Sequence, residues 1–370
     1  MSQQPQILQL ISSLEPYGAA YTLRLLLNRL PREAGEMRVV TLSADRRELE
    51  RWRDSGIDCQ SVRRRWPWDP IALGRLARVL RSADPTLIHA WDMPSLVYQR
   101  ASLSLARGRR RAAPLVANVS GARSSSWLLR TATRQAARVV VASRQQQRLV
   151  TAQGIAPDKL QRIPPAAEAA AMAATSRDGF LEQLRLPPNA RLIVVAGPLL
   201  GEHRTDDAIW NFELVRVLHP NCRLLVVGDG PQRQRLERFA RLVCEPGSVR
   251  FLGQRNDLPE ILQQAELFWQ ASESQTTPEV VLQAMAAGLP VVASDIGAHR
   301  ELIDPNRTGW LAPVGSRADW GRLTDRLLND TASACQIGAA AAQYAAENFS
   351  VERMSDSYAK LYADLLHSKR

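Results

Sequence analysis

The stretch of the chain with the clearest potential for chemistry runs from Ala271 to Glu301. Its pattern predicts the end of a strand, a polar loop, an amphipathic helix and a second strand, Val291 to Ser294. Thr276 and Thr277 lie in the loop, directly before the helix. The amino terminus of a helix presents free N–H donors and a partial positive charge. In an α/β protein, this combination at the carboxyl end of a strand predicts a site for a phosphate-bearing ligand.

Other kinds of site are less well supported. The five histidines show no metal-ligand pairing, so we expect no metal site; they are His89, His203, His219, His299 and His367. No Gly-x-Ser-x-Gly sequence marks a hydrolase nucleophile, and no Gly-x-Gly-x-x-Gly follows the first predicted strand. The four cysteines lack metal-type spacing and are typical of buried thiols in a reducing cytoplasm. We therefore expect no bound cofactor.

The elements that position the Ala271 to Glu301 stretch alternate along the whole chain. Apolar runs predict strands at residues 7–11, 37–42, 59–62, 86–90, 114–119, 139–142, 191–196, 223–227, 249–252, 267–269 and 291–294. Helix-like segments separate them, which predicts parallel sheets covered by helices on both faces. We predict the fold class α/β, with a basic first domain at 1–170, a linker at 171–188, a second domain at 189–345 and a closing helix at 346–370. Two doubly wound domains of this kind would face each other across a ligand cleft.

Positive charge is concentrated in the first half of the chain. The net charge is +11, but residues 1–185 hold 29 Lys and Arg against 15 Asp and Glu, a net of +14. No acidic residue lies between Asp92 and Asp158, where the arginines are Arg100, Arg107, Arg109, Arg110, Arg111, Arg123, Arg130, Arg134, Arg138, Arg144 and Arg148. Such a surface attracts polyanions: phospholipid headgroups, acidic glycans or nucleic acid. Nucleic acid is the least favoured, because no reading helix or aromatic-basic motif accompanies the charge.

The amino terminus favours a soluble protein. The opening MSQQPQILQLIS has no basic flank and predicts a first strand rather than a signal peptide. No apolar run approaches the ~18 residues that span a bilayer. We expect a cytoplasmic protein, with peripheral association at the inner membrane face as a hypothesis.

Four segments of the second half resemble the retaining glycosyltransferases of family 4, which have the two-domain GT-B fold. The segments are LLVVGDGPQRQRLE from Leu224, SVRFLGQRNDLPEIL from Ser248, PEVVLQAMAAGLPVVASDIGAHRELI from Pro278 and TGWLAPVG from Thr308. The first half is similar to the family at residues 7–30, 87–91 and 137–150. The resemblance implies transfer of a sugar from a nucleotide diphosphate sugar without a metal.

The resemblance also implies which residues should form the donor site. Family members carry two glutamates eight positions apart, the first near the transferred sugar and the second on the ribose; these positions hold Gln275 and Gln283. A neutral amide still hydrogen-bonds a ribose hydroxyl, but it cannot stabilise an oxocarbenium-like transition state by charge. Glu273 and Glu279 lie nearby, six positions apart. A solvated loop acid and a helix-start acid are their ordinary interpretation, with a surrogate role as the alternative.

Further family positions differ in this sequence. The Arg and Lys that neutralise the donor diphosphate correspond to Pro198 and His203, with Arg204 adjacent. In the first domain the family's glycine pair is reduced to Gly18, and its His-x-His motif reads His89-Ala90-Trp91. His89 is either catalytic or a satisfied histidine beneath the cleft. By resemblance, the expected nucleotide-sugar contacts are Gly18, His203, Arg204, Gly228, Leu252, Gln275, Thr276, Thr277, Gln283 and Gly297.

Two hypotheses follow from these residues. The chain is a family 4-like glycosyltransferase with a remodelled donor site and an unknown acceptor, for which a lipid-linked or acidic glycan is one candidate class. Alternatively, it is a catalytically inactive relative that keeps the cleft for binding or acts as a partner of another protein. The donor sugar, the acceptor and the oligomeric state are not predicted by the sequence.

Overall fold

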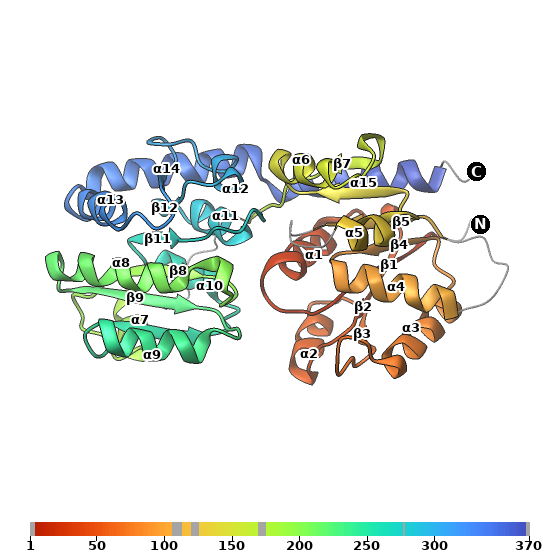
Figure 1. Ribbon diagram of the computed structural model, residues 1–370, viewed down its shortest axis with the longest axis horizontal. Helices are drawn as coiled ribbons and strands as arrows, with labels where there is room; N and C mark the ends of the chain where they lie inside the picture. The colour runs from red at the N-terminus through yellow and green to blue at the C-terminus, as the bar shows by residue number, and fades with distance from the viewer. Residues whose placement is uncertain (1–3, 106–112, 120–125, 169–174, 277, 368–370) are drawn as a thin grey trace. The chain divides into compact units, whose positions relative to one another are not determined.

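The computed structural model describes residues 4–105, 113–119, 126–168, 175–276 and 278–367 (Figure 1). Thr277 and the five arginines Arg107, Arg109, Arg110, Arg111 and Arg123 lie outside the described residues. The chain forms two compact units. The N-terminal unit comprises residues 1–165 together with 351–370, and the C-terminal unit comprises residues 166–350.

The N-terminal unit is a seven-stranded parallel sheet in the order β3-β2-β1-β4-β5-β6-β7. Its strands are β1 (Gln6–Ile11), β2 (Glu36–Thr41), β3 (Cys59–Ser61), β4 (Leu87–Ala90), β5 (Leu115–Asn118), β6 (Arg138–Val141) and β7 (Leu160–Arg162). Its helices are α1 (Gly18–Arg29), α2 (Arg46–Asp54), α3 (Pro70–Ala83), α4 (Met93–Leu105), α5 (Ser126–Thr133), α6 (Arg144–Ala152) and α15 (Val351–His367), with 3-10 turns η1 (Arg32–Ala34) and η2 (Pro157–Lys159).

The C-terminal unit is a six-stranded parallel sheet in the order β10-β9-β8-β11-β12-β13. Its strands are β8 (Arg191–Ala196), β9 (Cys222–Val227), β10 (Val249–Gly253), β11 (Leu267–Gln270), β12 (Val291–Ser294) and β13 (Trp310–Ala312). Its helices are α7 (Arg177–Gln183), α8 (Thr205–Leu218), α9 (Arg233–Val243), α10 (Leu258–Gln263), α11 (Glu279–Ala286), α12 (Gly297–Arg300), α13 (Arg317–Asn329) and α14 (Thr331–Asn348), with a 3-10 turn η3 (Gly201–His203). The α/β, doubly wound fold class predicted from the sequence is confirmed.

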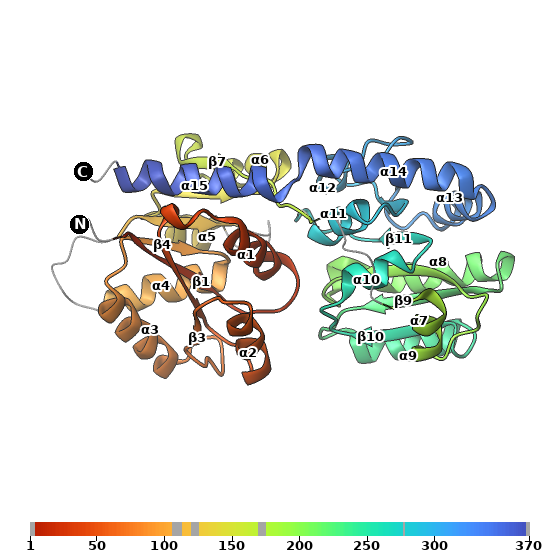
Figure 2. The same cartoon turned by 180° about the vertical axis from the view of Figure 1, so that it is seen from behind.

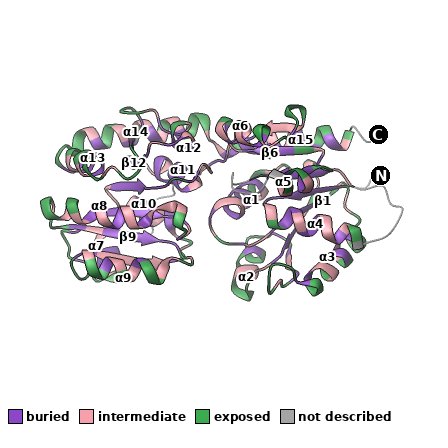
Figure 3. Cartoon of the chain, in the orientation of Figure 1, coloured by how far each residue is buried: buried purple, intermediate pink, exposed green. Residues whose placement is uncertain are grey.

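Strands and helices form where the sequence pattern requires them. Runs such as Leu87–Ala90 and Val291–Ser294 are buried at every position, as expected for central parallel strands covered on both faces. Figure 3 shows the buried strands between layers of partly exposed helices in each unit. Helix starts are marked by caps: the Asp45 side chain accepts from the Glu48 N–H in a capping box, and Asp69 caps α3 ahead of Pro70.

The structure adds to the predicted domain boundaries in two segments, the linker and the closing helix. The stretch expected to be a linker contains α7, whose Phe180 and Leu181 are buried in the C-terminal unit. The last helix, α15, belongs to the N-terminal unit, where it packs on α1 and pairs Glu352 with Arg29 at 2.6 Å (Figure 2). The chain therefore returns to its first unit after completing the second.

Candidate functional site

The candidate site of the C-terminal unit lies where its strand order reverses, between β8 and β11. At such a switch point the loops that follow the two strands diverge to opposite faces of the sheet and leave room for a ligand. After β8 come Gly197, Pro198 and η3, and after β11 comes the polar loop that leads to α11. The Glu273 N–H donates to the Glu202 carbonyl at 2.9 Å, and the Ser274 hydroxyl donates to the Glu202 carboxylate at 3.1 Å. These bonds hold the two predicted donor-side loops together.

Four polar side-chain atoms in residues 270–299 are buried and have no hydrogen-bond partner among the described residues. They are Gln270 Oε1, Gln275 Oε1, Gln283 Nε2 and His299 Nε2. An unpaired buried polar group costs about 1–3 kcal/mol, so groups of this kind usually meet a ligand or water. All four belong to neutral amides or an imidazole, which suit the hydroxyl groups of a sugar or ribose. Two of the four, Gln275 and Gln283, stand at the family's acid positions.

Gln283 lies on α11 and is only 5% exposed, whereas Gln275 lies in the loop and is half-buried. The helix begins at Glu279 after Pro278, and no side chain caps its first N–H groups in the part of the chain that the structure describes. Thr276 is also half-buried, and its hydroxyl shares a hydrogen bond of 2.9 Å with the Ser274 hydroxyl. The helix start and the two glutamines thus belong to one continuous segment.

Two histidines beside the switch point are neutral at pH 7. The His203 Nδ1 lies over Gly197, in a small pocket that Pro198 and Gln270 also line. Burial lowers the pKa of His203, opposed by the Glu202 carboxylate. Burial lowers the pKa of His299 to about 4, and its Nδ1 donates to the Ser294 carbonyl at 2.7 Å. The family's lysine position, His203, therefore carries no full charge at pH 7.

Arg204 carries a charge next to these histidines, but two carboxylates share it. Its guanidinium contacts Asp207 at 2.6 Å and Glu273 at 3.3 Å, and both interactions raise the pKa of Arg204. A diphosphate would have to compete with these carboxylates for the guanidinium. Glu273 therefore lies in an ion pair with Arg204, a contact that the interpretation as a solvated loop acid did not include.

Glu279 is the ionisable group closest in sequence to Gln283, one helical turn before it. Its side chain is half-buried, and burial raises its pKa to about 7 despite a backbone hydrogen bond that favours the charged form. Near neutral pH the carboxyl is therefore about half protonated. A protonated Glu279 can donate a hydrogen bond, which a solvated acid at a helix start does not do.

Among the predicted contact residues in the loops after the strands, Gly228 is a position where the backbone requires glycine. A Cβ on Gly228 would lie 2.0 Å from the Gly197 carbonyl oxygen, and Gly228 has φ +138°. This glycine lets the loops after β8 and β9 pack backbone against backbone. Leu252 lies at the irregularity where β10 shifts register between Phe251 and Gly253, and Gly297 opens the four-residue helix α12. Their contacts with a ligand stay predictions.

In the N-terminal unit, Gly18 and His89 have different surroundings. Gly18 opens α1 with φ +54°, and no atom lies within 4 Å of the Cβ it lacks among the described residues. His89 is fully buried, and burial lowers its pKa to about 3. Its Nδ1 lies 2.7 Å from the Tyr362 hydroxyl and its Nε2 lies 2.8 Å from Asn118 Oδ1.

These contacts belong to a continuous chain of hydrogen bonds within the N-terminal unit. The Trp91 indole donates to Gln9, the Gln9 amide donates to the Tyr362 hydroxyl, and the Asn118 amide donates to the Tyr358 hydroxyl. Both ring nitrogens of His89 are satisfied if the imidazole is neutral with its proton on Nε2: Nε2 donates to Asn118 Oδ1, and Nδ1 accepts from the Tyr362 hydroxyl. The structure therefore favours the satisfied histidine of the two roles left open for His89, because neither ring nitrogen is available for chemistry.

Within the described ranges, no group of three His, Cys, Asp or Glu side chains is arranged to hold a metal ion. Among these same residues, no helix has the length and apolar character needed to cross a bilayer.

Comparison with protein families identifies both units. Residues 176–344 match the family described as glycosyl transferases group 1, and residues 16–170 match glycosyltransferase family 4. The chain is 31% identical over 257 residues to a GDP-mannose-dependent alpha-mannosyltransferase of Mycobacterium tuberculosis, covering 65% of this chain and 64% of that protein. It is 28% identical over 167 residues to N-acetyl-alpha-D-glucosaminyl L-malate synthase of Bacillus anthracis, covering 45% and 44%. The chain thus spans less than two thirds of either relative.

Solved structures match over almost the whole chain. Anabaena HepE in complex with UDP-glucose superposes with a TM-score of 0.82 and 20% identity, covering 98% of this chain and 99% of that one. The TarM protein of S. aureus, solved with UDP, superposes with a TM-score of 0.76 and 10% identity, covering 97% and 99%. At these identities the similarity establishes the fold.

Sequence reasoning missed two residues of the site. Gln270 ends β11 and directly precedes the stretch from Ala271 to Glu301. His299 lies within the motif that begins at Pro278, but it was weighed only as a metal ligand. The available signal was a polar side chain at the end of an otherwise apolar strand, and a histidine on a short turn after β12.

Proposed function

This chain belongs to glycosyltransferase family 4, and from that membership we propose that its C-terminal unit binds a nucleotide diphosphate sugar and transfers the sugar with retention of configuration. The observation that supports the proposal most strongly is the set of unpaired buried polar atoms at Gln275 and Gln283. Both stand where the family's acids contact the transferred sugar and the ribose. A site that had lost its ligand would be expected to fill these positions with apolar or mutually paired side chains.

The donor site we propose is nearly neutral. Gln283 binds a ribose hydroxyl, and Gln275 binds a hydroxyl of the transferred sugar. The diphosphate lies at the amino end of α11, where the free N–H groups and the helix dipole favour an anion. His203 contacts the phosphate and gains a proton on binding, because an adjacent dianion raises the pKa of an imidazole.

The neutral site predicts slow transfer. Loss of the carboxylate at position 275 removes a charge that stabilises the oxocarbenium-like transition state, and Pro198 cannot contact the departing phosphate through its side chain. Removal of one such electrostatic contact typically lowers kcat by about 10²–10³-fold. We expect donor binding to be retained better than turnover.

The same residues favour a second candidate function, a non-catalytic nucleotide-sugar-binding protein. The observation in its favour is that Gln275, Gln283, Pro198 and His203 together replace two acids and two cations of the family pattern. Under this alternative, the N-terminal unit binds a partner protein or a glycan, and no sugar is transferred.

A titration paired with a donor-turnover assay separates the two. The full chain is titrated with UDP-glucose, UDP-N-acetylglucosamine and GDP-mannose, and release of the nucleoside diphosphate is then followed with each. Micromolar binding with turnover supports the transferase, and binding without turnover supports the second candidate. If no donor binds at millimolar concentration, both are wrong.

A restored variant tests the assignment of residues. Gln275→Glu, Gln283→Glu, Pro198→Arg and His203→Lys are combined in one protein, with a thermal melt to confirm folding. We expect tighter donor binding and faster turnover than in the natural sequence. A folded quadruple variant with undetectable donor binding would show that these positions do not form the site.

A further inference from the structure

We propose that a basic pocket beside α5 in the N-terminal unit binds the phosphate of anionic phospholipid headgroups at a membrane surface. The inference is independent of sugar transfer, since it uses no residue of the C-terminal unit. It assigns three of the cations in the first half of the chain, Arg130, Arg134 and Lys159, to one defined site.

The pocket has a volume of about 770 Å³ and is lined by Trp127, Arg130, Arg134, Gly154 and Lys159, among others. Trp127 and Arg130 lie one turn apart on one face of α5, and Arg134 lies in the turn that directly follows the helix and lines the same pocket. The opposite face of α5 holds the buried Leu129 and Ala132. The cationic face therefore points away from the core.

In the part of the chain that the structure describes, no carboxylate neutralises the three cations of the pocket. Within the described ranges, Arg130, Arg134 and Lys159 form no ion pair, and no Asp or Glu lines the pocket. The nearest acid in sequence, Asp158, precedes Lys159 but is exposed and is not among the lining residues. Three uncompensated cations around one cavity favour a phosphate over a neutral ligand.

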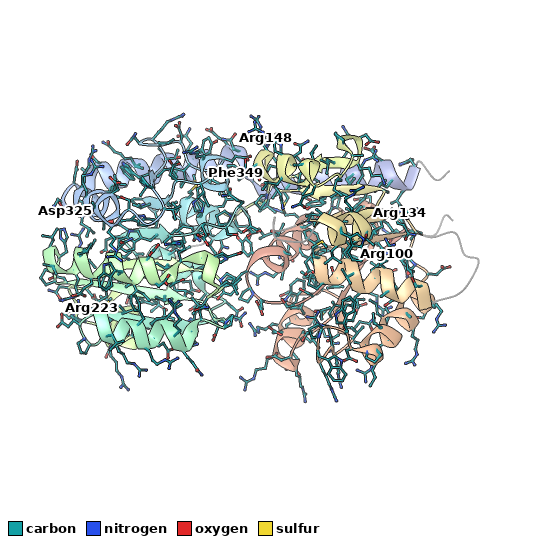
Figure 4. All side chains as sticks on the ribbon, viewed as in Figure 1. Arg100, Arg134, Arg148, Arg223, Asp325 and Phe349 are labelled. Carbon is teal, nitrogen blue, oxygen red and sulfur yellow. The ribbon has the colours of Figure 1, made fainter. Side chains whose placement is uncertain are left out.

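The pocket is also held in shape. The Lys159 ammonium donates to the Arg134 carbonyl at 3.1 Å, and the Arg100 guanidinium donates to the Thr131 carbonyl. Arg100 and Arg134 are both labelled in Figure 4, around α4 and α5. The Arg130 side chain lies against Gly154, where a Cβ would come within 3.2 Å of its Nε. A larger residue at position 154 would therefore displace Arg130.

The position of the pocket separates it from a substrate site of this sheet. Arg134 comes shortly before β6 and Lys159 directly before β7, so the pocket lies at the amino ends of the strands. Ligands of parallel α/β sheets bind at the carboxyl ends, where Gly18 and Trp91 lie in this unit. A phosphate in the pocket would therefore tether the protein rather than react.

The exposed Trp127 favours a lipid headgroup over a soluble phosphate. Its side chain is 73% exposed at the rim of the pocket. An indole prefers the membrane–water interface, where its ring meets acyl chains and its N–H stays hydrated. A soluble anion would use the cations and leave the indole without a role.

Vesicle binding of the full chain tests the proposal. The protein is sedimented with vesicles of phosphatidylcholine alone and of phosphatidylcholine mixed with phosphatidylglycerol. We compare wild type with two triple variants. The pocket variant is Arg130→Gln/Arg134→Gln/Lys159→Gln. The matched control is Arg47→Gln/Arg78→Gln/Arg81→Gln, which removes three exposed charges from α2 and α3. Circular dichroism confirms that both triple variants fold, and Trp127→Ser serves as a milder second variant.

Cations near an anionic membrane contribute roughly five-fold each to binding, so the pocket variant should bind mixed vesicles about 100-fold more weakly. The control should change binding by less than about five-fold, because its charges lie outside the pocket and are screened beyond about 10 Å. Trp127→Ser should weaken vesicle binding while leaving any binding of inorganic phosphate unchanged.

Three results would overturn the proposal. They are equal loss in the two triple variants, equal binding of wild type to both vesicle types, and binding of inorganic phosphate without binding of mixed vesicles. The last result would identify the pocket as a site for a soluble phosphate.

Discussion

Replacement of Glu279 by glutamine should stabilise the C-terminal unit, and the gain should grow with pH. In the folded chain the pKa of Glu279 is raised to about 7 by burial, against 4.5 for the exposed carboxyl. A folded-state pKa above the unfolded value means that the folded state binds the proton more tightly. The carboxyl therefore destabilises the fold increasingly as pH rises from 4.5 to 7, and Glu279→Gln removes that cost.

The size of the effect follows from the difference of the two pKa values. Each pKa unit corresponds to about 1.4 kcal/mol, so the penalty approaches about 3 kcal/mol at pH 8, with partial exposure making this an upper value. At pH 5 the same two pKa values give a penalty of about 1 kcal/mol, and at pH 4 almost none. The stabilisation by Glu279→Gln should thus increase by up to about 2.5 kcal/mol between pH 5 and pH 8.

Urea denaturation followed by circular dichroism at pH 5, 6, 7 and 8 measures this trend. Glu273→Gln is the control, because it removes an acid of the same loop that lies in an ion pair with Arg204. Its effect should stay within about 1 kcal/mol, as for a surface pair. A gain for Glu279→Gln that is equal at pH 5 and pH 8 would refute the raised pKa and the burial that causes it.

Three further predictions follow from the structure. Tyr362→Phe leaves the buried His89 Nδ1 without its hydrogen-bond donor and should lower the free energy of unfolding in urea by about 1–3 kcal/mol. Tyr344→Phe changes a half-buried tyrosine and should lower it little. Equal effects of the two variants would contradict the hydrogen-bond chain. Gly228→Ala places a Cβ 2.0 Å from a carbonyl oxygen and should lower the free energy of unfolding by more than about 3 kcal/mol. The control Gly321→Ala changes a helical glycine with open space around it and should raise the free energy of unfolding by about 0.5–1 kcal/mol. A mild effect at position 228 would rule out the close packing of the two loops. His203→Lys restores a full charge and should tighten nucleoside diphosphate binding by about 10-fold at pH 8 in a titration, with His367→Lys as the control; unchanged affinity would remove His203 from the phosphate site.

Strands were the most predictable part of the fold. The predicted runs from residues 7–11 to 291–294 correspond to β1–β6 and β8–β12, because central parallel strands are continuous apolar segments. The strands β7 (Leu160–Arg162) and β13 (Trp310–Ala312) were not predicted as such. Each is three residues long and lies at the edge of its sheet, where few positions exist for a periodic signal. The strand β3 is equally short and also lies at an edge, yet its run was predicted, so length and position alone do not explain the two missed strands.

The contents of the candidate site were only partly predictable. The register of the family motifs placed Gln275, Gln283 and His203 at the switch point, since motif positions follow the order of strands. The ion pairs of Arg204 and the unpaired Gln270 and His299 depend on side-chain packing across loops, which spacing along the chain does not encode.

The surroundings of His89 show a second limit. Its partner Tyr362 lies 273 residues away in sequence, on a helix that returns from the far end of the chain. A histidine at the end of a strand has the same local pattern whether it is catalytic or buried in a polar network. Only the tertiary contact with α15 distinguishes the two roles.

The central claim is that Gln283 belongs to a donor site whose contacts are neutral. The most direct measurement is a calorimetric titration of UDP-glucose and GDP-mannose into wild type, Gln283→Ala and the control Gln60→Ala. The control also removes a glutamine with an unpaired buried amide, but this glutamine lies in β3. We predict that wild type and Gln60→Ala bind one of these donors with equal affinity and that Gln283→Ala binds it at least about 10-fold more weakly, as expected for the loss of a buried hydrogen bond. Equal affinity of Gln283→Ala and wild type, or no binding of either donor to wild type, would contradict the account.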